Sequence, residues 1–136
     1  MSYQLASSTW DSKEIDAIHR VIESDRYTMG EEVAAYERAF SSYCGSRYSV
    51  MVSSGSTANL LMIAAMFFTK DKSRQLKRGD EVIVPAVSWS TTYFPLQQYG
   101  LKVKFVDINR HTLNIDLEKL ELAITEDTRA ILAVNL

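Results

Sequence analysis

The clearest prediction of the fold comes from residues 48 to 68, where an apolar segment, a small polar segment and a second apolar segment follow one another. Residues 48 to 68 read YSVMVSSGSTANLLMIAAMFF. The apolar beginning predicts a strand from Tyr48 to Val52, the small polar residues from Ser53 to Thr57 predict a tight turn, and the apolar remainder predicts a helix from Ala58 to about Phe68. A strand, a tight turn and a helix in this order are the opening of a βα unit.

Strands and helices continue to alternate after this unit. Glu81 to Pro85 contains a Val-Ile-Val run that suits a sheet buried on both faces. A helix is predicted near Ser90 to Tyr99; because Pro95 lies in that span, the helix either starts late, with Pro95 in its first turn, or is kinked there. The remaining predicted elements are a strand at Val103 to Val106, a helix from the cap Asp116 through Ile124, and a strand at Ala130 to Asn135. This order predicts an α/β fold with a mainly parallel sheet and helices on both faces.

Two amphipathic helices are predicted before the βα unit. The first is capped by Asp11 or Ser12 and ends near Asp25, and the second runs from about Glu31 to Cys44, with Gly45 as its stop. We expect one partial domain, in which residues 1–45 form a helical segment and residues 46–136 form the first part of an α/β domain. Since the sequence stops on an apolar strand, we expect the rest of the domain to be absent.

Composition narrows the class of function. The chain has 136 residues, of which 46% are hydrophobic, and 15 Lys and Arg against 17 Asp and Glu leave a net charge of -2. This balance gives no reason to expect a nucleic-acid or anionic-membrane surface, so the predicted partner is a small molecule. The single cysteine, Cys44, fits a reducing cytoplasm, and the longest apolar run, Leu60 to Phe68, is too short for a membrane helix. We expect a cytoplasmic protein without a signal peptide.

The turn from Ser53 to Thr57 is the first candidate site. Gly55 lets a ligand approach the backbone closely, the first N–H groups of the following helix have no helical partner, and Ser56 and Thr57 add hydroxyls. A phosphate would fit there, although the turn is neither a Walker loop nor a dinucleotide fingerprint. The alternative is a capped helix start in which Ser and Thr only satisfy backbone donors.

Trp89 is the second candidate. It follows the strand that ends at Pro85, and ligands of open parallel sheets bind beyond the carboxyl ends of the strands. The indole would therefore lie on the same rim as Gly55 and could stack on a flat ring. A packing role is the alternative, but the polar Ser/Thr setting favours stacking.

Other residues give weaker signals. His19 and His111 have polar neighbours, and no residue at ligand spacing suggests a metal site. Asp107 and Asp116 are expected to serve structure. The basic loop containing Arg74, Lys77 and Arg78 could meet a nucleotide phosphate, but it is typical of a solvated loop.

Several separated motifs, taken in order, resemble the DegT/StrS family of sugar-nucleotide aminotransferases and dehydratases, which are fold type I pyridoxal-phosphate (PLP) enzymes. The resemblance implies the N-terminal part of the large domain of an aspartate-aminotransferase-like fold. The motifs are Thr28-Met29-Gly30 with Val33 and Tyr36-Glu37, the stretch from Ser53 to Asn59, Gly79 to Pro85, Phe105-Val106-Asp107, and Asn114-Ile115-Asp116.

Within the family, Leu5 to Trp10, Met51 to Met62 and Pro85 to Thr92 are similar to 3-dehydratases that act on GDP-4-keto-6-deoxy-D-mannose on the route to colitose. This resemblance implies PLP or pyridoxamine phosphate (PMP) as cofactor, with Gly55 and Ser56 holding its phosphate and Trp89 stacking on its pyridine ring. It also implies a nucleotide-sugar substrate, an amino donor such as L-glutamate, and a homodimer.

The resemblance places the catalytic residues beyond Leu136. Family members have an Asp that pairs with the pyridine nitrogen and, further on, a Lys or, in the 3-dehydratases, a His. We therefore expect no catalytic residue within this chain and no activity from it alone. An aminotransferase making a 4-amino sugar is the alternative of the same class, and a non-catalytic nucleotide- or phosphate-binding module is the alternative of another class.

Overall fold

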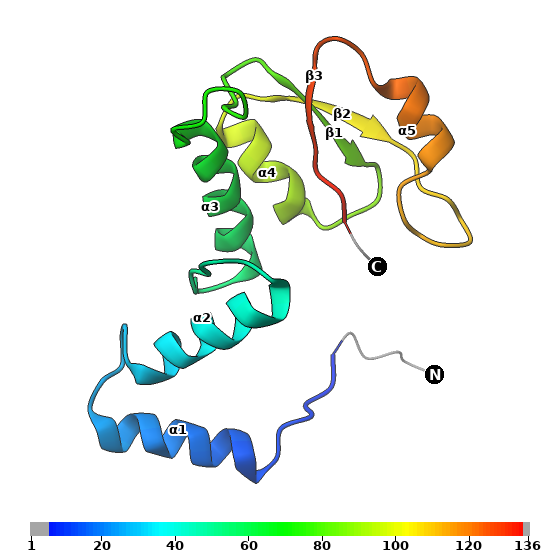
Figure 1. Cartoon of the computed structure of the whole chain (residues 1–136). Helices are drawn as coiled ribbons and strands as arrows, with labels where there is room; N and C mark the ends of the chain where they lie inside the picture. Colours follow the sequence, from blue (N-terminus) through cyan, green and yellow to red (C-terminus); the bar gives the residue numbers. More distant parts are fainter. Residues whose placement is uncertain (1–5, 135–136) are drawn as a thin grey trace. The chain divides into compact units, whose positions relative to one another are not determined.

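The structure, a computed structural model, describes residues 6–134, which form two compact units that divide between Met51 and Val52 (Figure 1). The first unit contains two helices, and the second contains a small sheet with three helices. The elements are α1 (Ser12–Ser24), α2 (Glu31–Cys44), α3 (Gly55–Phe68), β1 (Glu81–Pro85), α4 (Ser90–Gln98), β2 (Lys102–Val106), α5 (Leu117–Ala123) and β3 (Thr128–Ile131).

Local signals set the ends of the two helices in the first unit. The Asp11 side chain accepts from the Lys13 N–H, the Glu14 carboxylate accepts from the Asp11 N–H, and together they cap the start of α1. At the end of α2, Gly45 adopts φ 65°, the left-handed conformation that glycine adopts without strain. Both predicted helices are thereby confirmed.

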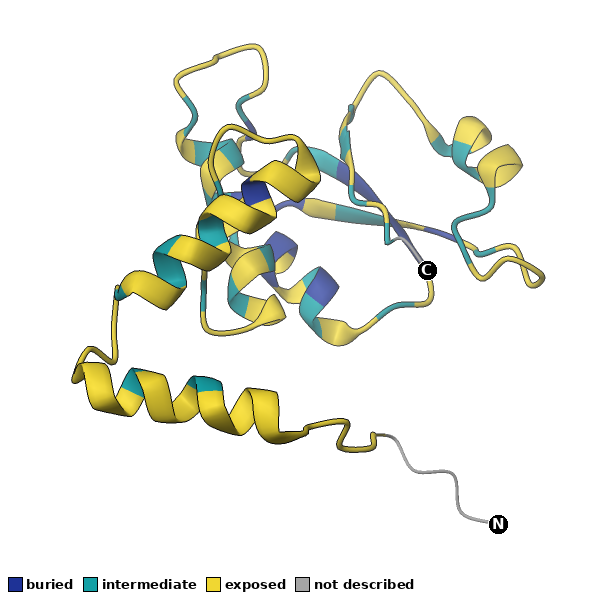
Figure 2. Ribbon diagram, turned by 60° about the horizontal axis from the view of Figure 1, so that its bottom comes forward, coloured by how far each residue is buried: buried dark blue, intermediate teal, exposed yellow. Residues whose placement is uncertain are grey.

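The second unit is built on a three-stranded parallel sheet in the order β2-β1-β3. Val82 and Val84 of the central strand are almost fully buried and belong to one core with Ile63 of α3 and Leu96 of α4. Figure 2 shows the buried residues concentrated on β1 and on the helices beside it. On the other face, Lys104 of β2 donates to the carbonyl of Ala123 at the end of α5. The predicted parallel sheet with helices on both faces is confirmed.

A polar network joins all three strands at the start of β1. The Glu81 carboxylate accepts from the Thr128 hydroxyl of β3 at 2.8 Å and pairs with the Lys104 ammonium of β2 at 3.4 Å. The Thr128 hydroxyl is the main reason why the pKa of Glu81 lies below its ordinary value, and the charge of Lys104 lowers that pKa further.

The predicted strand from Tyr48 to Val52 is wrong, because no strand forms in these residues. A strand needs a neighbouring strand for its backbone hydrogen bonds, and none of the described strands pairs with these residues. The Met51 N–H donates instead to the Glu37 carboxylate at 2.8 Å, and the Val50 side chain is exposed.

Several further boundaries differ from the sequence prediction, and β2, for example, begins at Lys102 rather than Val103. The α3 helix begins at Gly55 rather than Ala58, because Ser54 caps it. The α4 helix begins at Ser90 with Pro95 inside it, so the late start with Pro95 in the first turn is wrong. The last strand, β3, begins at Thr128, two residues before its predicted start. The strand ends at Ile131, so residues 132–134 are not part of it as predicted, and the predicted last residue, Asn135, lies outside the described residues.

Candidate functional site

The two candidate segments lie at the starts of two neighbouring helices. Gly55 and Ser56 open α3, whereas Trp89 is the N-cap residue of α4. Ile63 and Leu96 pack these helices into the same core, and the Asn59 side-chain amide donates to the Thr91 carbonyl at 3.2 Å. The fold therefore brings together two segments that are more than thirty residues apart in the sequence.

The start of α3 leaves two backbone donors unused. Ser54 and Thr57 form a reciprocal cap, in which the Thr57 N–H donates to Ser54 Oγ at 3.3 Å and the Ser54 N–H donates to Thr57 Oγ1 at 3.0 Å. The Thr57 hydroxyl, a predicted ligand contact, also bonds the Ser54 carbonyl at 2.8 Å, so the cap occupies it. Within residues 6–134, the N–H groups of Gly55 and Ser56 have no recorded acceptor. These donors point out of the helix start, where an anion is favoured.

Space is open beside these donors. A Cβ atom placed on Gly55 would meet nothing within 4 Å, and Gly55 is absent from the glycines with positive φ. The backbone therefore does not require a glycine at this position, and the missing side chain leaves the helix start open to a ligand. The adjacent Ser56 is exposed, and no partner of its hydroxyl is recorded among the described residues.

The indole of Trp89 is held at the surface rather than in the core. Trp89 is 76% exposed and lies outside the core cluster of the described residues. Two hydrogen bonds hold the backbone around Trp89 in place. The Tyr93 hydroxyl donates to the Pro85 carbonyl at 2.7 Å, and the hydroxyls of Ser88 and Thr92 are hydrogen-bonded to each other at 2.9 Å. A fixed backbone carrying an exposed aromatic ring provides a stacking surface.

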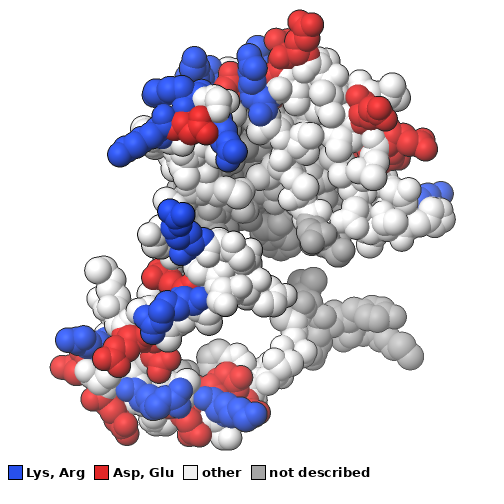
Figure 3. Space-filling model, in the orientation of Figure 1, with Lys and Arg blue, Asp and Glu red and all other residues white. Residues whose placement is uncertain are grey.

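The basic loop lies away from this site. Figure 3 shows Lys and Arg side chains gathered where the chain leaves α3, and Arg74 there pairs with Asp71 at 3.4 Å. A helix of 14 residues places its two ends about 20 Å apart, so the loop lies far from Gly55. The exposed basic residues of this loop are Lys70, Lys72, Arg74, Lys77 and Arg78.

The two predicted structural carboxylates do serve structure. Asp107 follows β2 and pairs with Lys119 of α5 at 3.0 Å, and this hydrogen bond is the main reason why the pKa of Asp107 is lowered and that of Lys119 raised. Asp116 caps α5 through the N–H groups of Glu118 and Lys119. In the part of the chain that is described, no group of His, Cys, Asp and Glu is arranged to hold a metal, and no helix has the length and apolar character to cross a membrane.

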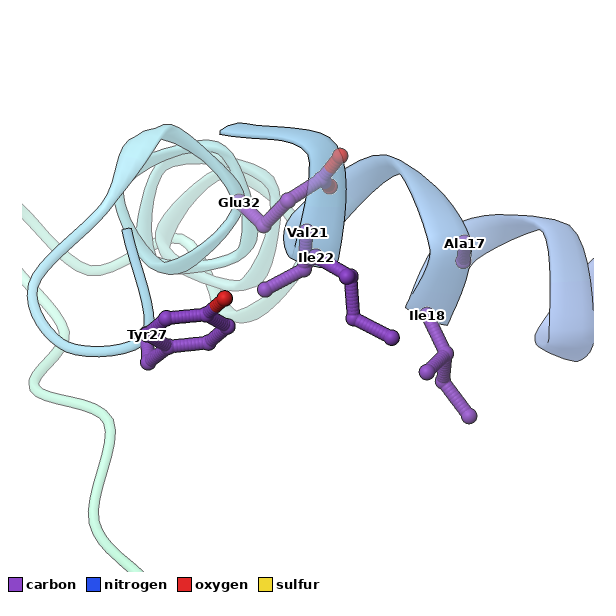
Figure 4. A pocket seen from close by; sticks show the side chains of 6 residues that line it. All are labelled: Ala17, Ile18, Val21, Ile22, Tyr27 and Glu32. Carbon is purple, nitrogen blue, oxygen red and sulfur yellow. The ribbon is translucent and has the colours of Figure 1, made fainter. Parts of the chain in front are cut away.

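The N-terminal unit has an open apolar groove of about 350 Å³ (Figure 4). Its lining offers one carboxylate and one phenol but no basic group that would bind a phosphate. The sequence prediction did not include this groove. It is lined by Ala17, Ile18, Val21, Ile22, Tyr27 and Glu32.

Comparison with known proteins shows where the chain belongs. Residues 8–136 match the family model described as the DegT/DnrJ/EryC1/StrS aminotransferase family. The chain is 71% identical over all 136 residues to GDP-4-keto-6-deoxy-D-mannose 3-dehydratase of Yersinia pseudotuberculosis and 65% identical to the protein of the same name from Escherichia coli O55:H7. It covers 34% of each of these relatives, about a third of their length.

A solved structure agrees with this assignment. The Escherichia coli GDP-4-keto-6-deoxy-D-mannose-3-dehydratase with bound hydrated PLP superposes with a TM-score of 0.91 at 66% identity, over 99% of this chain and 34% of that one. The α/β fold inferred from the alternating pattern is thus the fold of a PLP-binding relative over nearly the whole chain. On its sequence and on its fold, the chain belongs to the DegT/DnrJ/EryC1/StrS aminotransferase family.

Proposed function

We propose that this chain is the N-terminal part of a PLP- or PMP-dependent 3-dehydratase that removes the C3 hydroxyl of GDP-4-keto-6-deoxy-D-mannose. The observation that carries the proposal is the 71% identity to such an enzyme across all 136 residues, which include both candidate segments. On this reading residues 46–136 form the first part of the cofactor-binding domain, and the catalytic base lies in the part of the relatives that this chain does not cover.

The start of α3 fits the phosphate of the cofactor. The free N–H groups of Gly55 and Ser56 would donate to the phosphate oxygens, the Ser56 hydroxyl would add a third donor, and the missing side chain of Gly55 leaves room for the approach. The cap between Ser54 and Thr57 keeps these donors in place before any ligand arrives, so little ordering is required on binding.

Trp89 would cover one face of the pyridine ring. An aromatic platform fixes the plane of the cofactor, which limits proton transfers to the opposite face. When bound, the cofactor would supply an amine for the C4 ketone and an electron sink, which together allow the C3 hydroxyl to leave. This chain contributes binding and orientation, and the proton is moved by residues outside it.

The reaction is tested with the full-length protein, GDP-4-keto-6-deoxy-D-mannose, PLP and L-glutamate, followed by mass spectrometry of the nucleotide sugar. We expect a 3,6-dideoxy-4-keto sugar that has lost the C3 oxygen. A 4-amino sugar that keeps its C3 hydroxyl would indicate the aminotransferase instead, especially with a Lys at the catalytic position. Binding of a nucleotide without any affinity for PLP or PMP would indicate the non-catalytic module.

Two properties of the parent enzyme belong to the same proposal. We infer a homodimer, because the resemblance to the family implies an active site between two subunits, and a cytoplasmic location, because the single cysteine fits a reducing compartment. Sedimentation of the full-length protein with and without PMP tests the first property. A monomer that binds the cofactor with full affinity would contradict it.

A further inference from the structure

The hydrogen bond between Asn59 and Thr91 joins the two helices that begin at the candidate site. The Asn59 amide is partly buried and donates to the Thr91 carbonyl at 3.2 Å. Among the residues described, no other side-chain hydrogen bond recorded links α3 to α4.

Pro95 explains why the Thr91 carbonyl is available. In an α-helix the carbonyl of one residue accepts from the N–H four residues later, and the residue four positions after Thr91 is Pro95, which has no N–H. A carbonyl left unpaired in a partly buried position is costly. The Asn59 amide therefore supplies the donor that the helix itself lacks.

The position of this bond ties it to the site. Asn59 lies one helical turn after Gly55, and Thr91 lies two residues after Trp89. The bonds made by Tyr93 and Ser88 hold the Trp89 segment to β1 and to itself, but they do not fix its distance from the start of α3. Apolar packing of Ile63 and Leu96 holds α3 beside α4, and the link between Asn59 and Thr91 adds a directional bond at the helix starts that carry the site.

We propose that Asn59 is a positioning residue that fixes the spacing between the phosphate-binding start of α3 and the indole of Trp89. This inference rests on the proposed function. The phosphate and the ring of PLP or PMP belong to one small, stiff molecule, so both ends make good contacts only when the two protein segments are correctly spaced. Pro95 acts with Asn59, because it frees the carbonyl that Asn59 binds.

The test compares Asn59→Ala with a matched control in the full-length protein. Gln75 also donates from a side-chain amide to a backbone carbonyl, that of Phe67 at 2.7 Å, but at the opposite end of α3. Gln75→Ala therefore removes the same kind of bond from the same helix, away from the site. Urea unfolding of the cofactor-free protein measures stability, and titration with PMP, followed by absorbance and by circular dichroism of the bound cofactor, measures affinity and orientation.

We expect both variants to lower the unfolding midpoint to a similar extent. Only Asn59→Ala should weaken PMP binding, by up to about fivefold, because the free energy of one neutral hydrogen bond that holds the two segments in place must then come from binding. It should also reduce the circular dichroism per bound cofactor, a signal that a purely structural role would leave unchanged. Equal PMP affinity and equal dichroism in the two variants would overturn the proposal.

A second measurement tests the part assigned to Pro95. Pro95→Ala restores an N–H that can bond Thr91 within the helix, so Asn59→Ala should lower the unfolding midpoint less in that background than in the wild type. Equal lowering in both backgrounds would overturn the link between the two residues. If the wild-type protein bound neither PLP nor PMP, the proposed function would fail, while the unfolding cycle would still decide whether Asn59 compensates for Pro95.

Discussion

Replacing Gly55 with Ala should affect the stability of the protein and its affinity for PMP in opposite directions. The new Cβ would meet no atom within 4 Å, and the position is helical without a positive φ. Ala also loses less backbone entropy than Gly on entering a helix, so Gly55→Ala should leave the cofactor-free protein as stable as the wild type or more stable by up to about 1 kcal/mol.

Binding should respond in the opposite direction. If a phosphate approaches the free N–H groups at the start of α3, the methyl group lies in its path. Overpacking of this kind costs about 1 to 3 kcal/mol, which corresponds to a loss of PMP affinity of about 5- to 150-fold. The proposed site therefore predicts weaker binding by a protein that is at least as stable.

The assay pairs urea unfolding of the cofactor-free full-length protein with PMP titration by absorbance. Ser12→Ala, at the exposed first residue of α1, is the control, because it changes the same helix position far along the sequence from the site. Wild-type PMP affinity in a stably folded Gly55→Ala protein would mean that no ligand occupies the open space beside Gly55, and the proposed phosphate site would then be wrong.

Three other changes have definite expected outcomes. Trp89→Ala should shift the free energy of unfolding by less than about 0.5 kcal/mol, because the indole is 76% exposed, but should lower PMP affinity, with Trp89→Phe retaining more of it; titrations that match the wild type would contradict a stacking role. Leu96→Ala, in the middle of the core, should destabilise the protein by about 2 to 5 kcal/mol in urea, and a loss under 1 kcal/mol would mean that the core is not packed as described. Because the pKa of Glu81 lies below its ordinary value of 4.5, its carboxylate stabilises the fold fully above that pH, and this contribution is lost as the pH falls through the lowered folded-state pKa. Glu81→Gln should therefore flatten the loss of stability below about pH 4.5, relative to the exposed control Glu121→Gln, and parallel acid profiles would contradict this.

Elements with strong local signals could be predicted from the sequence. The helix from Glu31 to Cys44 ends at Gly45, where a left-handed glycine stops it, and both bounds agree with the structure. The strand from Glu81 to Pro85 was also predicted with its observed bounds, because its apolar run is short and ends in proline. In both cases the residues that set the boundary lie within the element or directly beside it.

Elements that depend on distant partners could not be predicted in the same way. The apolar residues from Tyr48 to Val52 resemble a strand, but a strand also needs a partner strand, and the local pattern carries no information about one. For α4 the sequence left two alternatives open, a late start with Pro95 in the first turn or a kink at Pro95. Pro95 leaves the Thr91 carbonyl without a partner within the helix, and Asn59, more than thirty residues earlier, donates to that carbonyl.

The sequence predicted single residues of the candidate site but not the contacts that bring them together. The sequence singled out Gly55, Ser56 and Trp89, and the structure adds that the first two carry free N–H groups and that the indole is exposed. The role of Asn59 was missed. A signal existed, since the proline four residues after Thr91 indicates an unpaired carbonyl, but its donor could be identified only from the packing of α3 against α4.

The central claim is that the start of α3 and the indole of Trp89 bind the two ends of one cofactor molecule. A crystal structure of the full-length protein with PMP tests it most directly. We predict phosphate oxygens within about 3.2 Å of the backbone nitrogens of Gly55 and Ser56, with the pyridine ring stacked on the Trp89 indole. A phosphate bound elsewhere, or a pyridine ring that does not face this indole, would show that these two segments do not bind one cofactor together.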